Sequence, residues 1–167
     1  KKRNIGHYQI YKFINSSRQK VIEIIHQKFH LILDIINNKV YCSCDLNENY
    51  YLTLKNVSIE DLRIRDRNTI YPVNPDYDTM DLRLFKWEMG AVLYECFFEK
   101  HQINDFLFKQ IDWPDYGALS FQKDYIQISS LLSVQAMSYQ ALISRFKMEV
   151  VNSFLNALYL TKSLALI

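Results

Sequence analysis

The sequence predicts an α+β fold, a small antiparallel sheet near the N-terminal half that is packed by helices. Short β-rich runs occur near the start of the chain, whereas later segments are apolar over helical lengths. Only three glycines and three prolines occur among 167 residues, so few tight turns and rather long elements are expected. A chain of this length with 49% hydrophobic residues can form one domain with a substantial core.

The N-terminal half is expected to contain a strand, a long helix and a hairpin. Residues 8–14 predict a short strand, and the polar residues 15–17 that follow suit a turn and a helix cap. Residues 18–36 have helical length and a broad apolar face, which predicts a helix ended by two asparagines. The β-rich runs 40–44 and 50–55 flank a polar link and predict a hairpin.

The remaining chain is expected to be a long loop followed by helices. Residues 58–75 are polar and rich in turn signals, which predicts the loop. Asp78 can cap a long helix over about residues 80–102, and the chain breaks again at 113–117. Two further helices are expected over residues 124–133 and 138–166, the second with a break near 150–152.

Charge, hydropathy and cysteine content limit the partners that the protein can bind and the compartment in which it is expected. The formal net charge of +2 does not favour a nucleic-acid partner. Residues 150–167 are apolar but are interrupted by Asn152, Asn156 and Lys162, so we expect a buried or partner-facing helix and no membrane span. Residues 1–3 are basic but no apolar stretch follows, so no signal peptide is expected there. Three cysteines cannot all pair, which indicates free thiols in a reducing, cytoplasmic compartment.

Two histidines, His26 and His30, are four residues apart within the segment 18–36. On a helix this spacing places both imidazoles on one face, close enough to bind one metal ion. Such pairs form the zinc-peptidase signature His-Glu-x-x-His, whose glutamate is the general base. Gln27 stands at the glutamate position, and an amide cannot accept the proton.

A zinc site also needs a third protein ligand, and a catalytic one keeps a position open for water. The candidates elsewhere in the chain are His7, His101, Glu88, Glu95 and Glu99. The alternative interpretation is a chance pair, with one histidine at the margin of the core and the other exposed to solvent.

Three segments in a fixed order extend the motif. Residues 15–33 approach the histidine pair through apolar positions and continue into a Leu/Ile run. Residues 87–98 (WEMGAVLYECFF) form a helical pattern that begins at Glu88, and residues 133–147 (SVQAMSYQALISRFK) form another. Together they resemble the ImmA/IrrE family of zinc metallopeptidases, in which a glutamate of the later helix is the third metal ligand.

The resemblance implies one metallopeptidase-like domain over residues 1–167, with residues 118–167 as a helical tail. Zn²⁺ would be bound by His26, His30 and Glu88, and the residue at position 27 would act on the metal-bound water. With Gln27 there, the domain would lack its base, either through an engineered substitution or as a natural pseudoenzyme. The implied substrate is a regulatory protein, such as a repressor of a phage or other mobile element.

A second hypothesis belongs to another class of function. It describes a non-catalytic protein-binding domain, of the immunity or inhibitor type, that needs no metal. Metal analysis of the purified chain separates the two hypotheses, because only the first requires bound zinc.

Overall fold

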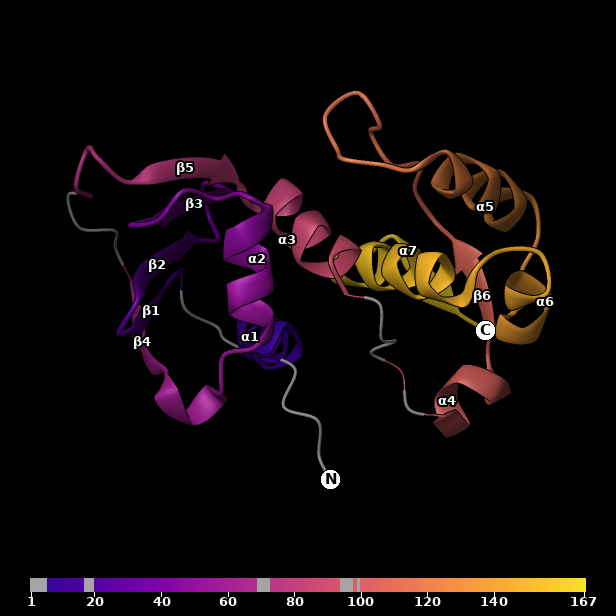
Figure 1. Cartoon of the computed structure of the whole chain (residues 1–167), viewed down its shortest axis with the longest axis horizontal. Coiled ribbons are helices and arrows are strands. Elements are labelled where there is room, and N and C mark those ends of the chain that lie inside the picture. Colours follow the sequence, from indigo (N-terminus) through magenta and orange to yellow (C-terminus); the bar gives the residue numbers. More distant parts are fainter. Residues whose placement is uncertain (1–5, 17–19, 69–72, 94–97, 99) are drawn as a thin grey trace. The chain divides into compact units, whose positions relative to one another are not determined.

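The computed structural model confirms an α+β fold (Figure 1). It describes residues 6–16, 20–68, 73–93, 98 and 100–167. The chain divides into two compact units, Lys1–Phe85 and Lys86–Ile167, and each is described by itself below. Helix α3 (Leu82–Ala91) crosses the boundary between them. The segment 118–167, expected as a helical tail, is part of the second unit.

The first unit is a five-stranded antiparallel sheet with the strand order β4-β1-β2-β3-β5. Helices α1 and α2 lie against one face of this sheet (Figure 1). The elements of the unit are α1 (Gly6–Ser16), β1 (Val21–His26), β2 (Phe29–Asp34), β3 (Lys39–Cys42), α2 (Glu48–Lys55), the 3-10 helix η1 (Ile59–Asp61), β4 (Arg63–Arg67) and β5 (Asp78–Asp81).

The helix expected over residues 18–36 is wrong, because this segment is the β1–β2 hairpin. Alternate positions are fully buried, such as Ile22 and Ile24 in β1 and Leu31 and Leu33 in β2. This is the period of two that a strand imposes on its side chains. The segment is rich in β-branched residues, whose restricted χ1 angles favour strands over helices.

Three other expectations for the first unit are also corrected. The strand expected over residues 8–14 lies within α1, where Ile10 and Ile14, four residues apart, share one buried helix face. The strand expected over residues 50–55 is α2, whose first turn is capped by the Asn47 side chain accepting from the Tyr50 N–H at 3.1 Å. The loop expected over residues 58–75 contains η1 and β4, while the strand expected from residue 40 is confirmed as β3.

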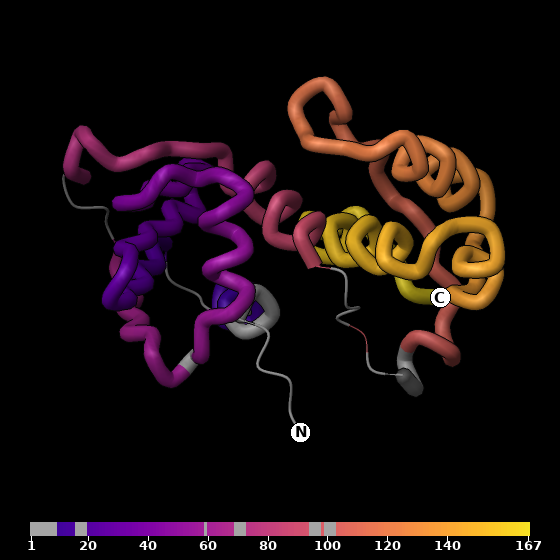
Figure 2. Tube along the Cα trace, viewed as in Figure 1, coloured from indigo at the N-terminus to yellow at the C-terminus, as the bar shows by residue number. Residues whose placement is uncertain are grey.

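The second unit combines helices with a three-stranded antiparallel sheet of order β7-β6-β8. Helix α7 runs through the middle of this unit (Figure 2), and most of its residues are buried. The elements are α4 (Lys100–Asp105), β6 (Leu107–Gln110), α5 (Lys123–Val134), β7 (Met137–Ser138), α6 (Tyr139–Ile143), α7 (Met148–Leu160) and β8 (Leu164–Leu166). The prediction that the apolar run after residue 150 is buried in the protein is confirmed.

The helix boundaries differ from those expected. Helix α3 begins at Leu82 because the Asp81 carboxylate, rather than Asp78, accepts the backbone N–H groups of Arg83 and Leu84. It ends at Ala91, whereas the sequence predicted a helix to about residue 102; residues 94–97 and 99 of that range lie outside the described residues. The helix over 124–133 is confirmed as α5.

The segment 138–166 contains α6, α7 and β8. Its helices are separated at residues 144–147, earlier than the break expected near 150–152. Across the described ranges, no helix has both the length and the apolar character needed to cross a membrane.

The contact between α3 and α7 depends on a glycine. A Cβ placed on Gly90 would lie 2.6 Å from the Cα and backbone N of Ala157, so the two backbones approach too closely for any side chain at position 90. One turn earlier, the buried Trp87 ring lies edge-on to Phe154 at 6.0 Å, and its Nε1–H donates to the Ser120 carbonyl at 2.8 Å. The small residue therefore lets α3 lie against the core of the second unit.

Gly90→Ala should lower the free energy of unfolding by about 1–3 kcal/mol, because an added methyl group must displace backbone. Urea denaturation followed by tryptophan fluorescence measures the change. Gly117→Ala is the matched control, since its Cβ would meet only the Asp115 side chain, at 3.2 Å, which can shift. Equal losses in the two variants would contradict the proposed role of Gly90.

Candidate functional site

The five residues of the histidine motif form the tip of the β1–β2 hairpin. His26 pairs with Phe29, so Gln27 and Lys28 are the turn, and His30 pairs with Ile25. Directly opposed residues share a face of a sheet, whereas adjacent residues of one strand point to opposite faces. The side chains of His26 and His30 therefore lie on opposite faces, and the expectation of a shared helix face is wrong.

His26 lies on the face that carries the core. Its ring stacks on Phe29 with 4.9 Å between the centroids, and its Nδ1 accepts the Lys28 N–H at 3.1 Å. Phe29 is buried and meets the Tyr50 ring of α2 edge-on at 5.4 Å. His26 is thus at the margin of the core, as the alternative interpretation of the pair proposed.

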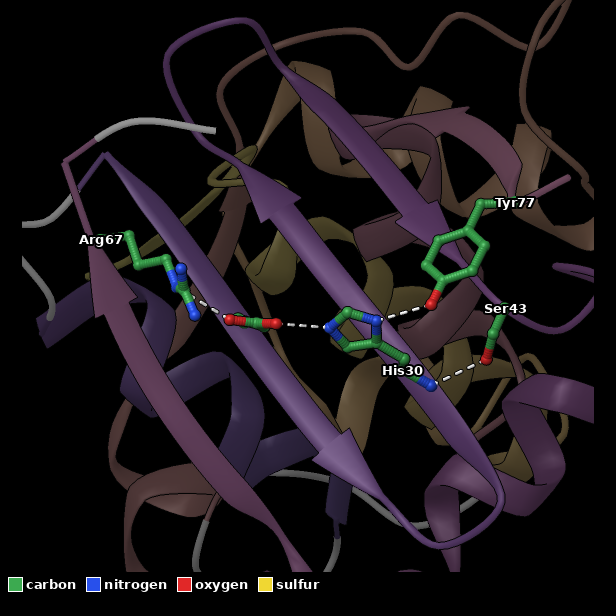
Figure 3. Close-up of polar contacts among 5 residues, drawn as sticks. His30, Ser43, Arg67 and Tyr77 are labelled. Carbon is green, nitrogen blue, oxygen red and sulfur yellow. Dashed lines mark hydrogen bonds and ion pairs between the residues drawn. The ribbon is translucent and has the colours of Figure 1, made fainter. Parts of the chain in front are cut away.

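His30 lies on the outer face, at the centre of a chain of polar contacts that we call the His30 network (Figure 3). Its Nε2 is 2.6 Å from Glu23 Oε1, and its Nδ1 is 2.7 Å from the Tyr77 hydroxyl. The other Glu23 oxygen, Oε2, is ion-paired with Arg67 Nε at 2.9 Å. Ser43 Oγ accepts the backbone N–H of His30 at 2.8 Å.

The Glu23 carboxylate determines which ring nitrogen of His30 carries a proton. An ionised carboxylate only accepts hydrogen bonds, so Nε2 carries a proton and donates to Glu23. In a neutral ring Nδ1 then accepts from the Tyr77 hydroxyl, and in a charged ring it donates to the same oxygen. The network thus links β1, β2, β4 and the residue before β5; Glu23 Oε2 is buried and meets Arg67 as an ion pair without a hydrogen bond of good geometry.

These residues do not fit a shared zinc ion. Both ring nitrogens of His30 are engaged by protein groups, and His26 points to the other side of the sheet. Within the described part of the chain, no three His, Cys, Asp or Glu side chains gather closely enough to hold a metal. Glu88 belongs to the second unit, where its Oε1 accepts from the Ser120 hydroxyl at 2.6 Å, so its approach to the histidines stays a prediction.

Gln27, expected at the position of the catalytic base, is exposed in the hairpin turn. Together with its neighbours it lines an open cleft of about 500 Å³, mostly polar, formed by His26, Gln27, Lys28, Thr53, Asn56, Val57, Ser58 and Asp61. The lysine and the aspartate bring opposite charges to this cleft. It has room for a small polar solute, but its residues form no arrangement that would activate a nucleophile.

The sequence interpretation missed Glu23, Arg67 and Tyr77 as partners of His30. A signal for Glu23 was present: it is the only carboxylate in β1 and has apolar residues on both sides, and such a residue needs a nearby partner. Reading residues 21–34 as a hairpin around a two-residue turn would have placed it on the face of His30. No local pattern indicates Arg67 or Tyr77, which are far away in sequence.

The second unit carries a different candidate site, the loop between β6 and α5. In this aromatic loop (residues 111–121), Trp113 is 54% exposed and Phe121 is 48% exposed. Both rings contact Tyr116, with centroids 6.0 Å and 5.3 Å away. Tyr116 in turn lies edge-on to the buried Trp87 at 6.3 Å, so the exposed rings rest on the core.

The aromatic loop is held by its own hydrogen bonds. Asp115 accepts the Gly117 N–H through its side chain at 3.0 Å and the Leu119 N–H through its carbonyl at 2.9 Å. The Tyr116 hydroxyl donates to the Tyr125 carbonyl at 3.3 Å, and burial raises the pKa of that hydroxyl. The sequence interpretation treated residues 113–117 only as a chain break, although exposed tryptophan in a turn is itself a binding signal.

Comparison of the chain with protein-family models, with curated proteins and with solved structures finds no match in any of the three. The resemblance to the ImmA/IrrE metallopeptidases consequently stays a prediction that depends on the sequence segments alone.

Glu23→Gln should lower the free energy of unfolding by about 1–3 kcal/mol, because an amide keeps the volume but removes the charged acceptor of both His30 and Arg67. Chemical denaturation measures the loss. Glu60→Gln is the control, since Glu60 is exposed in the same unit and the charge change is identical. A loss no larger than that of the control would show that the His30 network contributes little to stability.

Proposed function

We propose that this chain is a non-catalytic protein-binding protein and that the aromatic loop is its contact surface. The observation that carries the proposal is the pair Trp113 and Phe121, two large aromatic side chains about half exposed yet held in place by Tyr116. Ile111, at the start of the loop, is 62% exposed and extends the apolar area.

The physical basis is the energetics of protein interfaces. Binding hot spots are enriched in tryptophan, tyrosine and arginine, and they are surrounded by a polar rim. Asp112 and Asp115 are exposed beside the two rings and supply such a rim. A loop already ordered by internal contacts loses less conformational entropy on binding than a flexible one. Full burial of one of these side chains contributes about 1.5–3 kcal/mol.

The geometry of the histidines favours this hypothesis over the peptidase. A zinc peptidase would need His26 and His30 on one side of the chain, whereas their strands direct them to opposite faces. The immunity or inhibitor type, and the cytoplasmic location inferred from the cysteines, are part of the same proposal. The partner would be a protein that presents an apolar pocket to the aromatic loop.

Replacing both Trp113 and Phe121 by alanine should abolish capture of at least one protein from cell extract, as measured by quantitative mass spectrometry. The matched control replaces Ile126 and Val134, which are exposed apolar side chains of α5 in the same unit. Unfolding midpoints verify that both variants remain folded. If every captured protein is retained equally by both variants, the aromatic loop is not the contact surface.

Metal analysis separates the two function classes directly. The purified chain, produced in zinc-containing medium, should contain far less than one zinc per molecule, because the two imidazoles lie on opposite faces of the sheet. Exchange of His30 for alanine should leave the metal content unchanged. One zinc per chain that is lost in both His26→Ala and His30→Ala would instead support the metallopeptidase hypothesis.

A further inference from the structure

The aromatic loop is acidic, although the chain as a whole has a formal net charge of +2. Residues 111–121 contain two aspartates, Asp112 and Asp115, and no lysine, arginine or histidine. Both aspartates are exposed, and neither forms an ion pair with any residue that the structure describes. The loop therefore places two carboxylates beside its exposed rings without a cation of its own.

The orientation of the rings leaves aromatic faces open to solvent. The planes of Trp113 and Tyr116 are perpendicular, at 90°, and those of Tyr116 and Phe121 are inclined at 59°. A T-shaped contact places the edge of one ring against the face of the other, so Tyr116 covers at most one face of Trp113. The face of an aromatic ring is partly negative and attracts a cation within about 6 Å of the ring centroid.

The cations nearest to the loop along the chain do not use this surface. Lys109 of β6 and Lys123 at the start of α5 flank the loop, and both are exposed. In the described part of the chain, neither lysine forms an ion pair with Asp112 or Asp115 or a cation–π contact with the exposed rings. The surface is thus complementary to a cation that another molecule supplies.

We propose that the aromatic loop binds an arginine side chain of its partner protein. The guanidinium group would stack on the open face of Trp113 and donate hydrogen bonds to the carboxylates of Asp112 and Asp115. A guanidinium group is planar and its N–H donors lie in that plane, so it can stack on a ring and bind a carboxylate at its edge simultaneously. This inference rests on the proposed function, because it specifies the partner of the same loop.

Arginine fits this surface better than the other cationic side chains. The ammonium group of lysine is strongly hydrated and has no planar face to stack on a ring. A trimethylated lysine has no N–H donor, so it would leave the two carboxylates without hydrogen bonds. Such quaternary ammonium groups are bound in cages of several rings, whereas the loop exposes Trp113 and Phe121 on either side of Tyr116.

The test uses the full chain, labelled with ¹⁵N, and the blocked peptide acetyl-Gly-Leu-Arg-Leu-Gly-amide. The chain has two tryptophans, of which Trp113 is exposed and Trp87 is buried. Addition of the peptide should shift the indole N–H signal of Trp113 and change that of Trp87 much less. A peptide with citrulline, a neutral side chain of nearly the same shape, should bind about 3–30-fold more weakly, the combined effect of a cation–π contact and an exposed ion pair.

A double variant tests the contribution of the carboxylates. Asp112→Asn with Asp115→Asn keeps the side-chain oxygen that accepts the Gly117 N–H but removes both charges. It should bind the arginine peptide nearly as weakly as the citrulline peptide, and its affinity for the citrulline peptide should not change. The matched control, Asp105→Asn with Glu149→Gln, removes two charges from exposed positions of the second unit outside the loop, and it should bind the arginine peptide like the unchanged chain.

Four results would overturn the assignment of arginine. They are equal affinity for the arginine and citrulline peptides, no shift of Trp113 with either peptide, an undiminished preference for arginine in the Asp112→Asn, Asp115→Asn variant, and equally tight binding of a lysine peptide. Equal affinities with a clear shift of Trp113 would leave the loop as a contact surface for apolar groups. Failure of the proposed function itself appears elsewhere, as equal capture from cell extract by the Trp113 and Phe121 variant and its control.

Discussion

The alternation of side chains along the β1–β2 hairpin is the constraint on which the first unit depends. It directs Ile24 and Leu31 into the core and leaves Glu23 and His30 on the outer face. A shift of one residue in register would exchange these two sets, burying a carboxylate and exposing the apolar residues. The hydrophobic core therefore determines where the polar network forms, and the network in turn connects β4 and the start of β5 to the hairpin.

In the second unit the corresponding constraint is the close approach of α3 and α7 at Gly90. Polar residues within the apolar helix α7 contribute to this approach instead of weakening it. The Ser153 hydroxyl donates to the Leu93 carbonyl at 2.7 Å, just beyond the end of α3. Asn152 accepts the Tyr139 hydroxyl at 2.7 Å and so connects α7 to α6. Buried polar groups are stable when they are paired in this way. Tyr116 of the aromatic loop contacts Trp87 of the same α3, so the exposed rings of the loop are packed against the core through Tyr116.

The contact surface proposed for the second unit, the aromatic loop, combines exposed apolar rings with the exposed acidic side chains of Asp112 and Asp115. The His30 network resembles a catalytic relay in composition, but both ring nitrogens of His30 are engaged by Glu23 and Tyr77, which is the pattern of a structural cluster.

The sequence alone was sufficient for several features. The α+β class, the helix α5, the strand β3 and the burial of the run after residue 150 followed from composition, local pattern and the length of apolar segments. These features depend on local propensity or on hydrophobicity, which a single segment carries by itself.

Tertiary structure decided whether the segment with the two histidines forms a helix or a hairpin. Its apolar residues fit one face of a helix as well as one face of a strand, so periodicity could not choose between them. Pairing of β1 with both β2 and β4 satisfies its backbone and buries alternate residues, and β4 comes from a distant part of the chain. On a helix, a spacing of four residues places two side chains on one face, whereas across a two-residue turn it places His26 and His30 on opposite faces. Only the pairing of the strands therefore determined whether the two histidines lie on one face.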